Sequence, residues 1–156
     1  METFAPPEIF RHTVDYGSLP EEMVAAGRFD WVAPEVSELD LSFDRTGTVE
    51  FEARYFQFDR AMRPSDVALH IEHWCPNQRW YPARFENIAA HAAAHPDEQR
   101  KFAILGLGSI FDFTSPAYRR IPCASRRESY RREFYLVILA TLYAPSCRFL
   151  AVRSLQ

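Results

Sequence analysis

Two histidines at a helical spacing are the first residues that could perform chemistry. His91 and His95 lie four residues apart in an alanine-rich stretch, so a helix would place both imidazoles on one face. The two zinc ligands of a zincin helix have the same spacing. The intervening residues are all alanines, however, so the glutamate that would act as general base is missing. We therefore predict a helix face with two partly exposed imidazoles and no metal site.

A second group of reactive side chains comprises His70, His73 and Cys75, which could form a metal cluster or a Cys–His pair. Cys75 precedes Pro76 at the expected end of a helix, where the helix dipole disfavours a thiolate, so a packed thiol is the preferred interpretation. The segment 106–109 (GLGS) lacks the lysine of a P-loop and the third glycine of a dinucleotide fingerprint. We predict no catalytic residue and no cofactor. An enzyme of unrecognised type, built around these histidines or Cys75, remains a third hypothesis.

Arginines are concentrated late in the chain. The first 100 residues carry a net charge of −9 and the remainder +6, within a total of −3. Six arginines between Arg119 and Arg132 lie near Tyr118 and Tyr130, and such a set could grip phosphates and stack bases. A solvated segment whose arginines pair with the acidic first part is the favoured interpretation, because the chain lacks an overall basic field. A small arginine-using nucleic-acid-binding protein is the alternative.

The composition indicates one globular domain that positions these residues. The chain has 156 residues, of which 47% are hydrophobic and 25% charged. No apolar run reaches the roughly 18 residues of a membrane helix. The N-terminus lacks a basic region followed by an apolar stretch, so we expect a cytoplasmic protein. The three cysteines include no CxxC motif, which predicts reduced thiols in place of a disulfide framework.

Hydrophobic periodicity predicts the elements. Residues 47–58 give the clearest strand pattern, because apolar and charged residues alternate. Apolar stripes predict helices at about 65–74 and 83–95. Other predicted elements are a short helix from Pro20 to Gly27, a strand at 102–107 and strand-like pieces near Ile121, at 134–139 and at 148–152. Helices in the first two-thirds followed by short strands and long irregular segments indicate an α+β fold. The expected core comprises Val49, Phe51, Ile71, Trp74, Phe85, Ile88, Phe102 and Phe149.

Four segments carry a resemblance to a known family: GRFDWV (27–32), HPDEQRKF (95–102), FAILGLGS (102–109) and CRFLAVR (147–153). Together they resemble the variable proteins of diversity-generating retroelements, in particular the short archaeal kind. In that family a reverse transcriptase copies a template with errors at adenines and so rewrites the C-terminal coding region. The resemblance implies a C-type lectin-like fold, with two main helices packed on short antiparallel strands and a loop-rich C-terminal third.

The resemblance also implies one domain over residues 1–156, a variable region at approximately 109–147 and binding of an unknown macromolecular ligand, which we expect to be a protein. The framework positions would be Phe134, Leu136, Leu139, Cys147, Arg148 and Phe149. The variable, ligand-binding positions would be Ser125, Arg126, Ser129, Tyr130, Tyr135, Val137, Ile138, Ala140, Thr141, Tyr143, Ala144, Pro145 and Ser146, and Leu142 could be variable too.

An almost wholly apolar run at residues 134–144 fits this interpretation. The run is long for a central strand, and its β-branched and aromatic residues suit a helix poorly. A buried pair of strands is the alternative, and we accept burial for Leu136 and Leu139. For eight of the variable positions we expect exposure on one contiguous face: Tyr135, Val137, Ile138, Ala140, Thr141, Tyr143, Ala144 and Ser146. Because Val137 and Ile138 are adjacent, they cannot both obey strand alternation, so we expect a bulge or loop to begin near Ile138.

Overall fold

The computed structural model describes residues 3–4, 8–74, 76–112, 118–127 and 130–155. Within these ranges the strands are β1 (Thr3–Phe4), β2 (Phe10–Asp15), β3 (Trp31–Val32), β4 (Thr48–Phe58), β5 (Tyr81–Pro82), β6 (Ile104–Leu105), β7 (Arg120–Arg126), β8 (Arg132–Ile138) and β9 (Arg148–Ser154). The helices are α1 (Pro20–Ala25), α2 (Pro64–Trp74) and α3 (Phe85–Ala94), with short 3-10 turns η1 (Pro34–Glu38), η2 (Pro76–Gln78) and η3 (Glu98–Arg100).

The nine described strands join into one mixed sheet. Its order is β1-β4-β9-β6-β7-β8-β3, with β2 added on β4 and β5 on β9. Strand β4 pairs antiparallel with β2 and β9, and β7 pairs antiparallel with β8 along seven residues of each strand. By contrast, β3 runs parallel to β8, and β6 runs parallel to β9. Strand β9 therefore lies between β4 and β6, so the C-terminal segment is a central part of the sheet.

The predicted C-type lectin-like α+β arrangement, with two main helices on short antiparallel strands, is wrong. The described structure is dominated by a mixed sheet that includes an eleven-residue strand and two parallel pairings. The C-terminal third is also richer in strands than expected, because β7, β8 and β9 have seven residues each. Consecutive residues along β7 and β8 are buried on both faces, which removes the polar alternation that would reveal a strand in the sequence.

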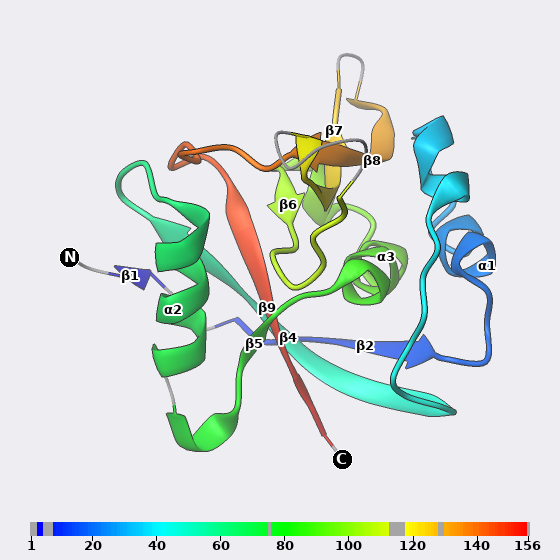
Figure 1. Ribbon diagram of the computed structural model, residues 1–156, viewed down its shortest axis with the longest axis horizontal. Coiled ribbons are helices and arrows are strands. Elements are labelled where there is room, and N and C mark those ends of the chain that lie inside the picture. The colour runs from blue at the N-terminus through cyan, green and yellow to red at the C-terminus, as the bar shows by residue number, and fades with distance from the viewer. Residues whose placement is uncertain (1–2, 5–7, 75, 113–117, 128–129, 156) are drawn as a thin grey trace.

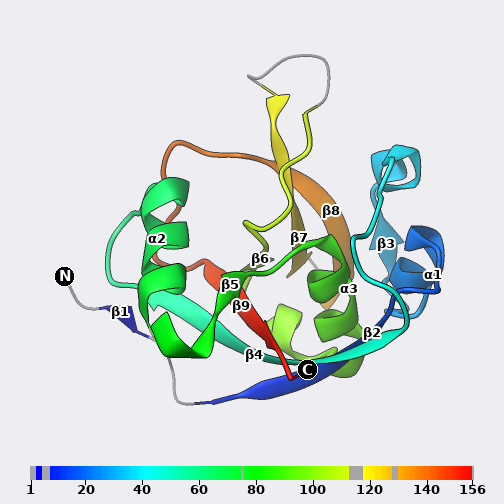
Figure 2. The ribbon, with the colours of Figure 1, turned by 60° about the horizontal axis from the view of Figure 1, so that its bottom comes forward.

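The two longer helices lie on opposite sides of the crossing strands β4 and β9. Figure 1 shows α2 on one side and α3 on the other, and Figure 2 shows the same separation from below. Both helices form close to the predicted ranges, because their apolar stripes face the sheet. Within the described part of the chain, no helix has the length and apolar character needed to cross a membrane.

Each helix covers one hydrophobic cluster. Helix α3 packs on β2 and β7 over a cluster that includes Phe85, Phe134 and Leu150, and α2 packs beside β5 over a cluster that includes Ile71 and Trp80. Most of the predicted core residues are buried, which confirms the expectation for Val49, Phe51, Ile71, Phe85, Ile88 and Phe149. The other two, Trp74 and Phe102, are half-buried at the edges of these clusters.

Candidate functional site

The connection between β8 and β9, residues 139–147, is an exposed loop with a buried anchor; we refer to it as the display loop. The anchor is Tyr143, which is 6% exposed and packs its ring 5.5 Å from that of Phe149. The Tyr143 amide donates to the Met62 carbonyl at 2.8 Å, and the Met62 amide donates back at 3.0 Å. The Ala140 amide donates to the Tyr143 hydroxyl at 3.2 Å. The middle of the loop is therefore tied to the fold.

The C-terminal end of the display loop is held by Arg148, the first residue of β9. Its guanidinium donates to the Ser146 carbonyl at 3.3 Å and lies 4.7 Å from the centre of the Phe102 ring. The Cys147 amide donates to the Ala144 carbonyl at 3.1 Å, which closes a turn. Five side chains between and around these anchors are exposed: Thr141, Leu142, Ala144, Pro145 and Ser146. Leu142 is 53% exposed. The loop thus combines a fixed backbone with outward-facing side chains.

The predicted positions on β8 divide between the two faces of the strand. Tyr135 and Val137 are half-buried on one face, and the Tyr135 hydroxyl lies 2.8 Å from the Ser125 hydroxyl on β7. Ile138 is 50% exposed on the other face and pairs with Arg120. The expected bulge or loop near Ile138 is a loop: regular pairing with β7 continues to Ile138, the last residue of β8, and the display loop begins at the next residue. Tyr135 and Val137 consequently do not share a face with Ile138.

The turn between β7 and β8 holds the upstream predicted positions. Tyr130 is 66% exposed with a φ of 62°, and the Arg126 guanidinium stacks 4.5 Å from its ring centre. Ser129 lies outside the described residues. The expected exposure of Tyr143 is wrong, because its side chain is buried, and Ser125, a predicted variable position, is buried too. Ser125 faces Tyr135 across the strand pair, and Tyr143 is drawn inward by its pairing with Met62, a partner that lies far away in the sequence.

Four of the late arginines are held by polar groups of the protein itself. Arg132 is 5% exposed, and its guanidinium donates to the carbonyls of Gly27, Ala92 and Pro96 at 2.7, 3.0 and 3.1 Å. Others meet carboxylates, in the pairs Arg119–Asp112, Arg120–Glu35 and Arg127–Glu133 at 3.0, 3.2 and 3.1 Å. The pairing of late arginines with acidic residues, including Glu35 of the acidic first part, neutralises much of the local charge.

The histidines expected on one helix face meet a third histidine. His91 is fully buried, and its Nε2 lies 2.6 Å from the Tyr55 hydroxyl. The ring of His12, on β2, lies 6.1 Å from that of His91, and the ring of His95 lies 5.1 Å from it. Sequence reasoning missed His12, although the alternation of Phe10, His12 and Val14 with exposed residues would have placed it inside.

Burial suppresses the charge of this histidine cluster. It lowers the pKa of His12 to about 4, with a smaller contribution from His95, and keeps the pKa of His91 well below the ordinary value. Within the described residues, no group of three or more His, Cys, Asp or Glu side chains is arranged to hold a metal ion. Cys75 lies outside those residues. Burial raises the pKa of the Cys123 thiol to about 12, which makes it a poor nucleophile.

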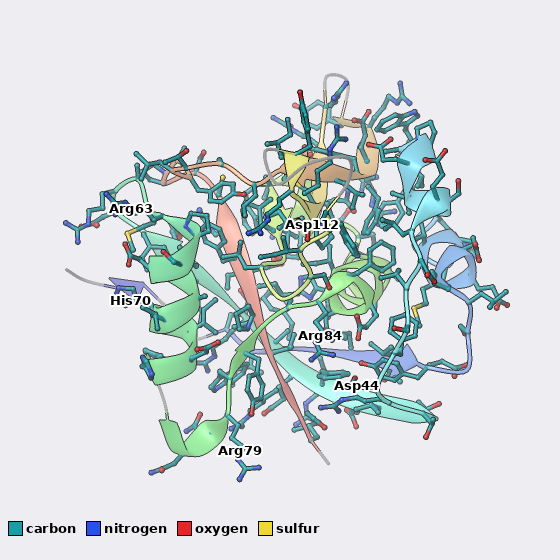
Figure 3. The ribbon with its side chains drawn as sticks, viewed as in Figure 1. Asp44, Arg63, His70, Arg79, Arg84 and Asp112 are labelled. Carbon is teal, nitrogen blue, oxygen red and sulfur yellow. The ribbon has the colours of Figure 1, made fainter. Side chains whose placement is uncertain are left out.

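Two hollows open on other parts of the surface. The larger, of about 810 Å³, is lined by Arg45, Arg79, Arg84 and Arg153 among other side chains. Arg84 forms an ion pair with Asp44 at 3.1 Å, and Arg153 forms one with Glu52 at 2.6 Å. Figure 3 labels Arg84 and Asp44, which lie close together. The smaller hollow, of about 510 Å³, lies between β2, α1 and α3. None of the predicted site residues lines either hollow.

Comparison of the chain with models of protein families, with curated proteins and with solved structures finds no match. The functional argument therefore rests on the geometry of the described residues.

Proposed function

We propose that this chain binds another protein as its macromolecular ligand, through the display loop and the adjoining Ile138. The observation that carries this proposal is the combination of a tied backbone with outward side chains. Tyr143 and Arg148 hold the loop, while Leu142 and Pro145 project into solvent. Because the backbone is already ordered, a ligand would bind with a smaller loss of conformational entropy.

The exposed side chains have the chemistry of a protein contact. Leu142 and Ile138 are both at least half exposed, and Ala144 and Pro145 add further apolar surface. Exposed apolar groups gathered on a fixed loop mark interaction sites more often than isolated ones do. Thr141 and Ser146 supply hydroxyls that can satisfy polar groups of a partner. A small apolar centre with a polar rim is the usual composition of such an interface.

The resemblance to retroelement variable proteins extends the proposal to diversification of this surface. The exposed loop positions can change without disturbing the core, whereas Tyr143 and Arg148 make contacts that a fixed scaffold requires. The DNA next to the gene tests this extension. We expect a reverse transcriptase gene and a near-copy of the 3′ coding end that differs from it at adenines. A flanking region without such a copy would overturn diversification and leave the binding proposal in place.

Retention of proteins from an extract of the source cells tests the binding proposal. The first variant replaces Thr141, Leu142, Ala144 and Ser146 together by aspartate. The matched control replaces Leu69 and Tyr81, which are 51% and 53% exposed on α2 and β5, by aspartate. We expect the wild type and the control to retain at least one protein from the extract. The loop variant should retain about tenfold less of that protein, or still less. Identical retention by all three immobilised proteins would overturn the proposal.

The same immobilised proteins distinguish a nucleic-acid ligand. If the arginines formed the binding surface, DNA would be retained by the loop variant and released steeply by added salt. Retention of that kind, with no protein lost from the loop variant, would favour nucleic-acid binding. The pairing of Arg119, Arg120 and Arg127 with carboxylates argues against this outcome.

A further inference from the structure

The smaller hollow, which we call the α1–α3 pocket, has an unusual distribution of charge. It has a volume of about 510 Å³, and its walls include His12, Asp15, Glu22, Met23, Glu86 and Ala93. Helix α3 packs against both β2 and α1, and Figure 2 shows the three elements next to one another. Residues of all three line the pocket. A volume of this size suits a small organic ligand.

Glu86 is the key residue of the pocket. It is only 3% exposed, and one of its carboxylate oxygens accepts a hydrogen bond from the Tyr16 hydroxyl at 2.9 Å. Among the described residues, no basic side chain lies within 4.0 Å of this carboxylate. Glu86 is the second residue of α3, where the helix dipole favours a negative charge. The arrangement keeps an acidic group largely out of water without a neutralising partner, which is costly in a free protein.

Two further carboxylates line the pocket and are also unpaired with bases in the described structure. Asp15 accepts a hydrogen bond from the Gly17 amide at 2.9 Å, and Glu22 accepts one from the Leu19 amide at 2.8 Å. The nearby Arg11 is directed to β4, where it lies 3.7 Å from Glu50 and from Glu52. The pocket therefore presents negative charge that its own arginine does not neutralise.

His12, which also lines the pocket, carries no positive charge at neutral pH. The Asn87 side-chain nitrogen lies 3.2 Å from Nε2 of His12, and its oxygen accepts a hydrogen bond from the Arg84 amide. The amide nitrogen is therefore the donor, and Nε2 of His12 is the acceptor. Because the pKa of His12 is lowered to about 4 by burial, this imidazole does not repel a cation.

The apolar part of the pocket lining consists mainly of alanines. Met23 and Ala26 contribute from the α1 segment, and Ala90, Ala93 and Ala94 contribute from α3. Methylene groups can pack against such a surface, whereas a hydrated metal ion gains nothing from it. The described carboxylates also do not converge as a metal site. The ligand that matches carboxylates without basic partners beside an alkyl surface is an organic cation.

We propose that the α1–α3 pocket binds an aliphatic ammonium compound, with the ammonium group on Glu86 and the alkyl chain along the alanines of α3. The ammonium donates hydrogen bonds to the carboxylate, and such charge-assisted bonds are stronger than neutral ones. The carboxylates of Asp15 and Glu22 near the pocket favour a second ammonium group, so a linear diamine should bind more tightly than a monoamine. This site is separate from the display loop and does not depend on the proposed function.

Titration monitored by amide chemical shifts tests the site. The probes are butylamine, 1,4-diaminobutane and the neutral butan-1-ol. We expect saturable shifts centred on α1, α3 and β2 with both amines, the diamine binding more tightly, and no saturable shift with the alcohol. Equal binding of butanol, or shifts centred elsewhere, would overturn the proposal. N-acetyl-lysine methylamide is the fourth probe. If it binds more tightly than butylamine, the natural ammonium group belongs to a lysine of a polypeptide. If it binds more weakly, the natural ligand is a free amine.

Three variants assign the effect to the pocket. Glu86→Gln keeps an acceptor for Tyr16 and removes the charge, so we expect amine affinity to fall by about tenfold or more. Ala93→Leu fills the pocket without changing charge and should weaken binding even if Glu86→Gln folds poorly. Glu72→Gln, at an exposed site on α2, is the matched control and should bind normally. Unchanged affinity in both pocket variants would overturn the proposal, whereas the aspartate variant of the display loop should bind amines normally.

Discussion

Two regions of the molecule reverse the usual placement of polar and apolar groups. The interior beneath α3 contains buried polar side chains, whereas the display loop carries exposed apolar ones. In the interior, the imidazole of His91 is buried beside the Tyr55 hydroxyl, and that of His12 is buried beside the Asn87 side chain. In the loop, Leu142 and Pro145 are exposed. Buried polar groups need partners, and distant parts of the chain supply one to Nε2 of each imidazole. Nδ1 of both rings is buried with no hydrogen-bond partner among the described residues. Exposed apolar groups need none for folding, so the loop residues are available for a ligand. The comparison separates contacts that maintain the fold from side chains that are free for binding.

The largest expected difference between the two regions concerns Phe149 and Leu142. Phe149 is 2% exposed on β9, directly against the ring of Tyr143, whereas Leu142 is 53% exposed. Phe149→Ala should lower the free energy of unfolding by about 3–5 kcal/mol, because it leaves a cavity in the core. Leu142→Ala should change it by less than about 0.5 kcal/mol. Urea unfolding of both variants measures the contrast, and equal losses would contradict it.

Two arginines that pair across the β7–β8 hairpin offer a second test. Arg126 and Arg132 are partners in the strand register, yet Arg132 is buried among backbone carbonyls and Arg126 stacks on the exposed Tyr130. Arg132→Ala should lower the free energy of unfolding by about 3 kcal/mol, since several buried carbonyls lose their donor. Arg126→Ala should have an effect below about 0.5 kcal/mol. If urea unfolding showed a larger loss of unfolding free energy for Arg126→Ala than for Arg132→Ala, burial would not distinguish the roles of the two arginines.

The buried imidazoles predict a loss of stability in acid. His12 has a folded pKa of about 4, against about 6.5 in the unfolded chain, so the unfolded state binds more protons below pH 6.5. The stabilisation is fully present above pH 6.5 and is lost progressively as the pH falls toward 4. His12 alone accounts for about 2 kcal/mol by pH 5. The pKa of His91 is shifted in the same direction and adds to the loss.

Urea unfolding between pH 7 and pH 5 measures this dependence. The variant His12→Gln should have a shallower decline than the wild type, because one titrating group is removed. His73→Gln, at an exposed position on α2, is the control and should follow the wild-type curve. Parallel curves for all three proteins would show that His12 is not held neutral by burial.

The long regular elements could be predicted from the sequence because their periodicity is local. Strand β4 and helices α2 and α3 each bury one face or stripe, so their apolar residues recur at regular intervals. The pairing of β6 and β9, which run parallel, leaves no such local trace. Glu52 shows the same limit: alternation predicts an exposed side chain, but its pairing with Arg153, about a hundred residues later, buries it.

The candidate site was predictable to a similar degree. Thr141 and Ser146 have the expected exposure, since short polar side chains in a connection between strands remain in water. Tyr143 does not, because its burial depends on its pairing with Met62, and the predicted variable position Ser125 is buried against Tyr135. A sequence shows which residues could be displayed, and only the fold shows which backbone segments are drawn inward.

The smallest expected effect is on the display loop itself, and it tests the comparison most directly. A library that varies Thr141, Leu142, Ala144 and Ser146 together should consist mostly of folded proteins, since surface substitutions change the free energy of unfolding by less than about 0.5 kcal/mol each. The resistance of the library members to digestion by a protease measures how many of them fold. Tyr143→Ala is the contrast within the same loop and should unfold more easily, because it removes a buried ring and its bond to Ala140. If most library members were digested as readily as Tyr143→Ala, the exposed side chains would be needed for folding and the loop would not be a display surface.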